Sequence, residues 1–181
     1  MTLEALNRID MSKYEGYLKD SQLGDFVNWA GYEHYRLLNH LCAGKPLVYD
    51  IGTYKGSSAI AMSSAKKVVS YNVEDQRESK KPKNVTFKIG DCLADPYLLN
   101  ADVIMLDTYH DGEFEKEFYD FIKPDFKGVL VLDDIHLNKP METFWRSITE
   151  PKEDLTKIGH YSGTGVVYFD GRKPKRCSSC G

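Results

Sequence analysis

Val48-Tyr49-Asp50-Ile51-Gly52-Thr53-Tyr54-Lys55-Gly56-Ser57-Ser58 has the pattern of a buried strand, a glycine turn and a helix start in direct succession. The apolar run that begins at Pro46 stops at Gly52, and an Ala/Ser/Met-rich helical pattern begins near Ser57. Two glycines four residues apart let the backbone turn sharply and let a ligand approach the main chain closely. Free N–H groups at the helix start would face that ligand. We therefore predict a ligand-binding strand–turn–helix unit.

Outward from this unit, short apolar runs alternate with helical patterns along the chain. Strands nearly free of polar residues, separated by helices, indicate a mostly parallel sheet that is covered on both faces. We predict a Rossmann-like, doubly wound α/β fold with a seven-stranded sheet and a C-terminal antiparallel strand pair. The expected strands span residues 47–51, 68–73, 85–89, 101–106, 128–132, 155–161 and 165–169, and the expected helices span 25–41, 57–65, 113–122 and 140–148.

Composition and length fit one globular domain. The 181 residues are 41% hydrophobic and 28% charged, and the net charge of −3 argues against a nucleic-acid partner. No apolar stretch approaches the ~18 residues that a membrane span needs. The N-terminal residues carry mixed charge and lack the apolar core of a signal peptide, so we expect a cytoplasmic protein without a membrane partner.

The two ends of the chain differ in composition from the middle. We predict a polar arm or short helix over residues 1–22, a single domain over 23–171 and a basic tail over 172–181. In that tail, Cys177 and Cys180 are half of a zinc site at best, and two free thiols are the simpler interpretation. The isolated Cys42 and Cys92 are expected to be packed or close to the ligand site.

Polar side chains recur at the predicted carboxyl ends of the strands. Ligands of parallel α/β sheets bind at this edge, so these side chains are expected to converge on one site. Residues of this kind are Asp50, Asn72, Glu74, Asp91, Asp107, Asp133 and Asp134.

Four segments together resemble one family of enzymes. They are Asp50-x-Gly52-x-x-x-Gly56-x-Ser58, Ile89-Gly90-Asp91, Met105-Leu106-Asp107-Thr108-Tyr109-His110, and Gly128-Val129-Leu130-Val131-Leu132-Asp133-Asp134. Over about residues 30–170, the chain resembles the class I S-adenosylmethionine (SAM)-dependent methyltransferases. More narrowly, it is similar to the small metal-dependent O-methyltransferases of the catechol and sugar type.

The resemblance implies a SAM site and a divalent cation, expected to be Mg²⁺. It gives Asp107, Asp133 and Asp134 as the metal ligands. One departure concerns the acidic residue that holds the ribose at the second strand end, because Asn72 stands there and Glu74 follows two residues later; either could hold the ribose. The candidate cofactor-binding residues are Asp50, Gly52, Thr53, Gly56, Ser58, Asn72, Glu74, Asp91, Cys92 and Asp107.

Methyl transfer to a hydroxyl needs an in-line approach and removal of a proton. A hard cation bound by carboxylates can lower the pKa of the hydroxyl, and three carboxylates suit Mg²⁺, Ca²⁺ or Mn²⁺ better than Zn²⁺. His136 and His110 flank the acidic residues as candidate general bases, with His136 ahead because it follows the acidic pair directly, and Asp107 completes the catalytic set. The plainer alternatives are surface histidines and a helix-capping acidic pair.

The acceptor is expected to be a small molecule or the exposed end of a glycan. Among hydroxyl acceptors, the resemblance favours a sugar over a catechol. Two other classes stay open: a binding or regulatory protein with a weakened cofactor site, and a different nucleotide-cofactor enzyme on the same sheet. The sequence also leaves open whether the chain forms a homo-oligomer.

Overall fold

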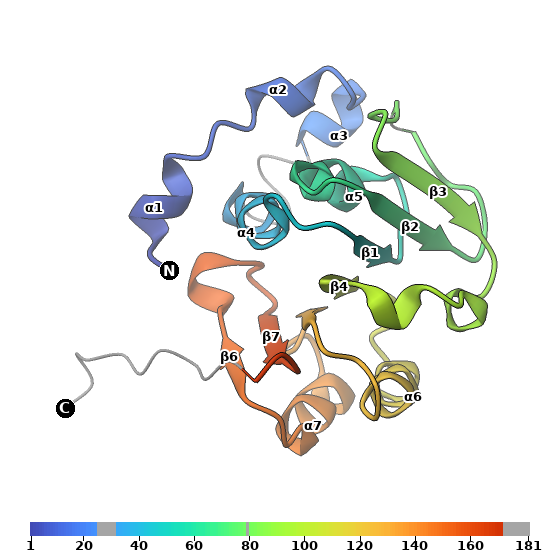
Figure 1. The fold of residues 1–181 in the computed structure, drawn as a ribbon. Coiled ribbons are helices and arrows are strands. Elements are labelled where there is room, and N and C mark those ends of the chain that lie inside the picture. The colour runs from blue at the N-terminus through green and yellow to red at the C-terminus, as the bar shows by residue number, and fades with distance from the viewer. Residues whose placement is uncertain (25–31, 79, 172–181) are drawn as a thin grey trace.

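A seven-stranded mixed sheet forms the centre of the computed structural model, which describes residues 1–24, 32–78 and 80–171. The strand order is β3-β2-β1-β4-β5-β7-β6 (Figure 1). Strands β1 to β5 are parallel, and β7 runs antiparallel to both β5 and β6. The predicted fold class is confirmed. The strands are β1 Val48–Ile51, β2 Val68–Asn72, β3 Val85–Ile89, β4 Val103–Leu106, β5 Val129–Asp133, β6 Lys152–Asp154 and β7 Thr164–Tyr168.

Helices cover both faces of this sheet (Figure 1). On one face, α4 and α5 pack against one cluster of buried side chains, and on the other face α6 and α7 pack against a second cluster. The helices are α1 Leu3–Asn7, α2 Ser12–Glu15, α3 Asp20–Gly24, α4 Tyr32–Cys42, α5 Ser57–Ala61, α6 Glu113–Ile122 and α7 Lys139–Ser147. Short 3-10 helices are η2 Met62–Ser64, η3 Cys92–Ala94, η4 Leu98–Asn100 and η5 Thr156–Ile158.

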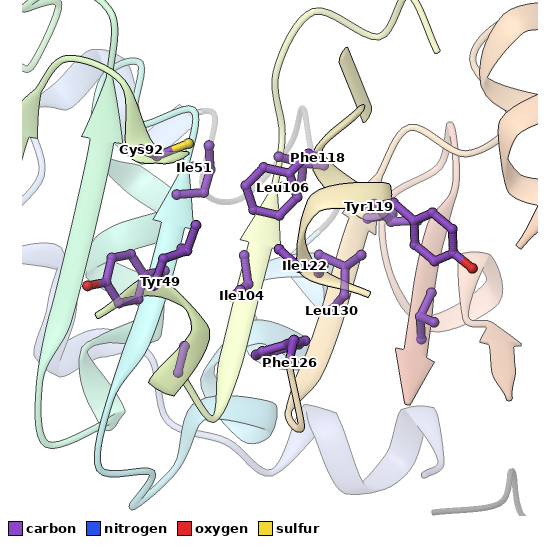
Figure 2. Close-up of a cluster of buried hydrophobic side chains, with 14 of the residues drawn as sticks. Tyr49, Ile51, Cys92, Ile104, Leu106, Phe118, Tyr119, Ile122, Phe126 and Leu130 are labelled. Atoms are coloured by element: carbon purple, nitrogen blue, oxygen red, sulfur yellow. The ribbon is translucent and has the colours of Figure 1, made fainter. Parts of the chain in front are cut away.

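The alternation of strand side chains explains why both faces need a cover. Along β4, Ile104 and Leu106 belong to the α6/α7 cluster, whereas Val103 and Met105 belong to the α4/α5 cluster. Figure 2 shows the first of these clusters, where side chains of β1, β4 and β5 meet Phe118 and Ile122 of α6. Both faces of the central strands are therefore apolar, which matches the near-continuous hydrophobic runs of the sequence.

The N-terminal residues form three short helices that lie along the domain (Figure 1). Helix α1 contacts α4, and Met11 and Tyr14 are buried in the α4/α5 cluster. Gln22 of α3 is fully buried and donates hydrogen bonds to Lys55 O at 2.9 Å and to Ser57 Oγ at 3.3 Å. The side chain of Gln22 therefore links the N-terminal helices to the glycine turn after β1.

Two expectations about element boundaries need correction. The strand expected over 155–161 is wrong: β6 spans Lys152–Asp154, and η5 occupies Thr156–Ile158. The reason is that β6 is an edge strand of three charged residues, without the apolar pattern on which the prediction relied. The helix expected over 57–65 divides into α5 and η2. Residues 25–31 of the helix expected over 25–41, and the tail with Cys177 and Cys180, lie outside the described residues.

Among the described residues, no helix combines the length and the apolar character that crossing a bilayer requires.

Candidate functional site

A pocket of about 800 Å³ opens at the carboxyl ends of the parallel strands. It lies where the sheet order changes direction between β1 and β4, the usual ligand position in open α/β sheets. Its size falls within the range of small-molecule sites. The lining residues are Ile51, Gly52, Tyr54, Tyr71, Asn72, Val73, Gln76, Gly90, Asp91, Cys92, Leu93, Asp107, Thr108, Tyr109, Phe114 and Glu117.

Gly52 lines this pocket, and it also makes a close chain contact that the sequence did not show. Its φ is +102°, and a Cβ at this position would lie 1.6 Å from the backbone oxygen of Asp107. The turn after β1 and the end of β4 therefore approach each other so closely that only glycine fits. Gly56, with φ +98°, precedes α5 as its N-cap. The predicted strand–turn–helix unit is thus formed. In addition to exposing its backbone to the pocket, the turn packs against the backbone of Asp107.

Asp50 is fully buried beneath the turn. Its Oδ2 accepts a hydrogen bond from Ser70 Oγ at 2.6 Å, and Thr53 Oγ1 lies 2.5 Å from the same hydroxyl. Burial raises the pKa of Asp50 to about 6, against the opposing effect of the Ser70 and Ser58 hydroxyls. Asp50, Thr53 and Ser58 are buried supports of the turn, and none of them is among the lining residues of the pocket.

At the end of β2, the structure separates the two ribose candidates. Asn72 lines the pocket, and its Nδ2 donates a hydrogen bond to Glu74 O at 2.8 Å. Glu74 is exposed and is not a lining residue. At the end of β3, Asp91 and Cys92 line the pocket, and Asp91 Oδ1 accepts the N–H of Leu93 at 2.8 Å.

Beside the pocket lies a compact group formed by Asp133, Asp134 and His160. One potential ligand atom from each lies within 4.8 Å of the others. His160 Nδ1 lies 3.0 Å from Asp133 Oδ1 and 3.1 Å from Asp134 Oδ1. Both carboxylates are buried, at 5% and 8% exposure. The sequence predicted Asp133 and Asp134 here but gave no signal for His160.

Asp107 is connected to this group through His110. His110 Nε2 lies 3.1 Å from Asp107 Oδ1 and 3.4 Å from Asp134 Oδ2, and makes no hydrogen bond with the described part of the chain. Asp107 itself lies outside the compact group. The three carboxylates predicted as one ligand set are therefore arranged as a pair and a separate acid, with an imidazole between them.

The charges in this region strongly perturb one another. Burial acts to lower the pKa of His160 and of His110, but the neighbouring carboxylates outweigh it and raise these pKa values to about 10 and about 9. Burial, together with the charge of Asp107, raises the pKa of Asp133. The pKa of Asp134 is lowered because hydrogen bonds from His160 and Ser162 outweigh its burial. Such perturbed groups beside a pocket are typical of a functional site.

Glu115 holds the loop that carries His110. It is buried in the first turn of α6 and accepts hydrogen bonds from Thr108 Oγ1, His110 N and Gly112 N at 2.9, 2.8 and 2.9 Å. His110 has φ +56°, an unusual value for a residue other than glycine. Glu115 was not identified from the sequence, although its position three residues after Gly112 fits a helix-capping acid.

The structure places His136 away from these groups. Its Nε2 lies 2.7 Å from Asp154 Oδ2 on β6, and both side chains are partly exposed to solvent. It is not part of the Asp133–Asp134–His160 group. His110, by contrast, lies between Asp107 and Asp134 beside the pocket.

No protein-family model matches the chain, and no curated protein matches it in sequence. Solved structures do match the fold. A methyltransferase from Geobacter sulfurreducens has a TM-score of 0.58 at 13% identity, covering 90% of this chain and 98% of its own. The O-methyltransferase TomG from Streptomyces achromogenes, involved in tomaymycin synthesis and solved with SAM, has a TM-score of 0.55 at 15% identity, covering 94% and 100%.

A third match is an O-methyltransferase from Bacillus cereus in complex with SAH, with a TM-score of 0.51 at 14% identity and coverage of 92% and 90%. The chain spans 47% of a longer Streptococcus mutans chain assigned to the SAM-dependent methyltransferases. At these identities, the likeness concerns the fold. The chain has the fold of the class I SAM-dependent methyltransferases, related to that of the small O-methyltransferases, as the resemblance of its motifs implied.

Proposed function

We propose that this protein is a SAM-dependent O-methyltransferase that acts on a hydroxyl of a sugar, a glycan end or another small molecule. The observation that carries the proposal is the pocket of about 800 Å³ at the carboxyl ends of β1 to β4, centred on the Gly52 turn. Structures of the same fold were solved with SAM or SAH. The pocket offers polar groups at Asn72 and Asp91 and an apolar wall, which suits an adenosine moiety.

SAM would supply an electrophilic methyl group, and a divalent cation would favour ionisation of the acceptor hydroxyl. In the transfer, the C–S bond breaks as the O–C bond forms, which leaves S-adenosylhomocysteine. With a cation held by Asp133 and Asp134, the carboxylate charge that raises the pKa of His110 to about 9 would be offset, which would let the neutral His110 ring take up the hydroxyl proton at Nε2. Asp107 contacts both this imidazole and the pocket, so it orients the base toward the cofactor.

The residues that would hold a divalent cation are Asp133 and Asp134. They offer two adjacent buried carboxylates at the end of β5, and carboxylate oxygens are the ligands that hard divalent cations prefer. Asp107, the third ligand expected from the sequence, stands apart from this pair beyond His110. We propose that it serves mainly as the partner of His110.

Calorimetric titration of SAM into the purified protein, with Mg²⁺ and with a chelator, tests the cofactor. We expect binding at micromolar levels. A matched pair of variants locates the site: Asn72→Leu should weaken binding about tenfold or more, because it removes a polar group from the pocket, and Glu74→Leu should leave it unchanged. The opposite result would move the ribose to Glu74.

Absence of SAM binding under both conditions would overturn the proposal. A binding or regulatory protein would then become the leading alternative. If SAM binds, S-adenosylhomocysteine release with a panel of sugars, nucleotide sugars, catechols and small alcohols identifies the acceptor. Asp133→Ala should abolish metal-stimulated transfer and leave SAM affinity largely intact, because Asp133 is not a pocket-lining residue.

A further inference from the structure

We propose that His160 is a nitrogen ligand of the divalent cation together with Asp133 and Asp134, and that this site binds Mn²⁺ in preference to Mg²⁺. The inference rests on the cation in the proposed function and specifies both its ligands and its type. It departs from the ligand set of three carboxylates, Asp107, Asp133 and Asp134, that the sequence predicted.

The spacing of the three groups suits a shared ion. His160 Nδ1 lies 3.0 Å from Asp133 Oδ1 and 3.1 Å from Asp134 Oδ1. Adjacent ligand atoms about 2.1 Å from an octahedral ion lie about 3.0 Å from each other. A hydrogen-bonded imidazole can show the same distance to one oxygen, but here a single ring nitrogen faces both carboxylates at nearly equal distance.

One N–H group cannot satisfy everything that surrounds this nitrogen. Besides the two carboxylates, Ser162 Oγ lies 3.2 Å from His160 Nδ1, while Ser162 also donates a hydrogen bond to Asp134. A proton on Nδ1 can point at only one of the two carboxylates, and Asp134 Oδ1 already accepts the hydrogen bond from Ser162. A cation between the three groups would engage both carboxylates and the ring nitrogen at once.

His160 packs against a second histidine on its α4 side. Its ring centroid lies 5.3 Å from that of His34, a residue of α4 that is 3% exposed and whose Nδ1 has no hydrogen-bond partner in the described residues. His160 is therefore held between this buried ring and the two carboxylates.

The backbone fixes His160 in this position. Its N–H donates to Thr164 Oγ1 at 2.7 Å, and Gly163, with φ +119°, follows in a turn where a Cβ would lie 2.6 Å from Ile135. Asp134 also has a positive φ of +57°. Strained residues of this kind persist where function requires a fixed geometry. The connection between β6 and β7 therefore presents His160 to the end of β5 as a rigid unit.

An imidazole ligand changes the preferred ion. Mg²⁺ favours oxygen ligands and keeps much of its water, whereas first-row transition ions accept imidazole together with carboxylates. Mn²⁺ shares the carboxylate chemistry of Mg²⁺ and tolerates nitrogen. Between these two ions, the ligand set Asp133–Asp134–His160 therefore favours Mn²⁺ over Mg²⁺.

Electron paramagnetic resonance with Mn²⁺ on the full chain, without SAM, tests the inference. We expect Mn²⁺ to bind at least tenfold more tightly than Mg²⁺ and pulsed spectra to show coupling to an imidazole nitrogen. His160→Gln should remove the nitrogen coupling and weaken Mn²⁺ binding more than Mg²⁺ binding. His40→Gln, an exposed histidine on α4, is the matched control and should change neither. Circular dichroism confirms that each variant is folded.

Bound Mn²⁺ without nitrogen coupling in the wild-type protein would overturn the role of His160. Nitrogen coupling that persists in His160→Gln would assign it to another histidine, and would also overturn the proposal. Absence of Mn²⁺ binding would remove both this site and the cation of the proposed function. The separate SAM titration would still show whether the chain is a methyltransferase, so the two failures are distinguishable.

Discussion

The pocket side and the acidic side of the sheet edge are assembled in different ways. Around the pocket, each strand contributes residues from its own carboxyl end, as Gly52 does after β1 and Asn72 does at the end of β2. At the acidic side, Asp133 meets His160, which lies 27 residues further along the chain in a connection between two other strands. The first arrangement follows from the strand pattern, whereas the second depends on how a distant turn packs.

This difference has a physical origin. Parallel strands bring their carboxyl ends together automatically, so residues at strand ends can be assigned to a common site before the structure is known. A turn between antiparallel strands has no such rule, and its position follows from long-range packing. We therefore expect substitutions on the pocket side to act through backbone and burial, and those on the acidic side to act through charge and chemistry.

The largest expected effect is on the pocket side, at Gly52. Replacement by alanine places a Cβ 1.6 Å from Asp107 O at a φ of +102°, which requires β1 and β4 to separate. We expect a loss of more than about 4 kcal/mol in unfolding free energy, or no folded protein. Gly90→Ala is the matched control, since its φ of +134° is also positive but nothing lies within 4 Å, so only backbone strain of about 1–3 kcal/mol applies. Chemical denaturation followed by circular dichroism compares them, and equal losses would contradict the close contact.

The second effect concerns the base on the acidic side. We expect His110→Ala to lower kcat by about 10²–10⁴-fold, because His110 contacts Asp107 and Asp134 beside the pocket. His136→Ala should change kcat by less than about threefold, because its ring pairs with Asp154 at the surface. Steady-state kinetics at saturating SAM with the identified acceptor measures both. A larger loss in the His136 variant would restore the order taken from the sequence.

The third effect is a pH dependence of the unfolding free energy that comes from Asp50. Its pKa is raised from 3.8 to about 6, so the folded state holds the proton more tightly than the unfolded state. This residue therefore lowers stability progressively as the pH rises from about 4 to about 6, by about 3 kcal/mol in total. Asp50→Asn should remove that loss, so its gain over the wild type should grow between pH 4 and 6 and stay constant above. Urea unfolding of both proteins across this range measures the difference, and a gain independent of pH would contradict the raised pKa.

The smallest expected effect is at Gln22, which links the N-terminal helices to the pocket side. Gln22→Ala removes hydrogen bonds to Lys55 O and Ser57 Oγ, and we expect a loss of about 1–2 kcal/mol in stability and a several-fold weaker SAM affinity. Asn7→Ala is the control, because it removes an exposed hydrogen bond to Arg36 in the same N-terminal segment. Calorimetry on both variants would show whether the effect is specific to the glycine turn. Equal SAM affinities of the two variants would contradict an effect of the N-terminal helices on cofactor binding.

Much of the fold could be predicted because its signals are local. The glycine turn, the apolar strands and the amphipathic helix α6, which spans Glu113–Ile122 as expected, all follow from patterns within a few residues. The strand β6 could not be predicted, because three charged residues at a sheet edge carry no apolar period. Pairing with β7 defines this strand, and pairing is a tertiary property.

For the site, the sequence identified acids at strand ends but not the groups that pack against them. Asp133 and Asp134 lie at the end of β5 as expected, whereas Glu115 and His160 were missed because each acts through loops that meet only after folding. His136 was preferred because it follows the acidic pair directly in sequence. Its neighbour Ile135 is fully buried, and the chain direction there turns the His136 ring toward Asp154.

The charged edge strand β6 has a consequence for association in solution. An exposed edge is a template on which another chain can add a strand, and long apolar edges promote aggregation. Here the edge consists of Lys152, Glu153 and Asp154, which is short and carries both signs of charge. A strand from a second molecule could form few backbone hydrogen bonds with β6. Its side chains would also lie next to the charged side chains of this strand. We therefore expect this edge to resist growth of the sheet from one molecule into the next.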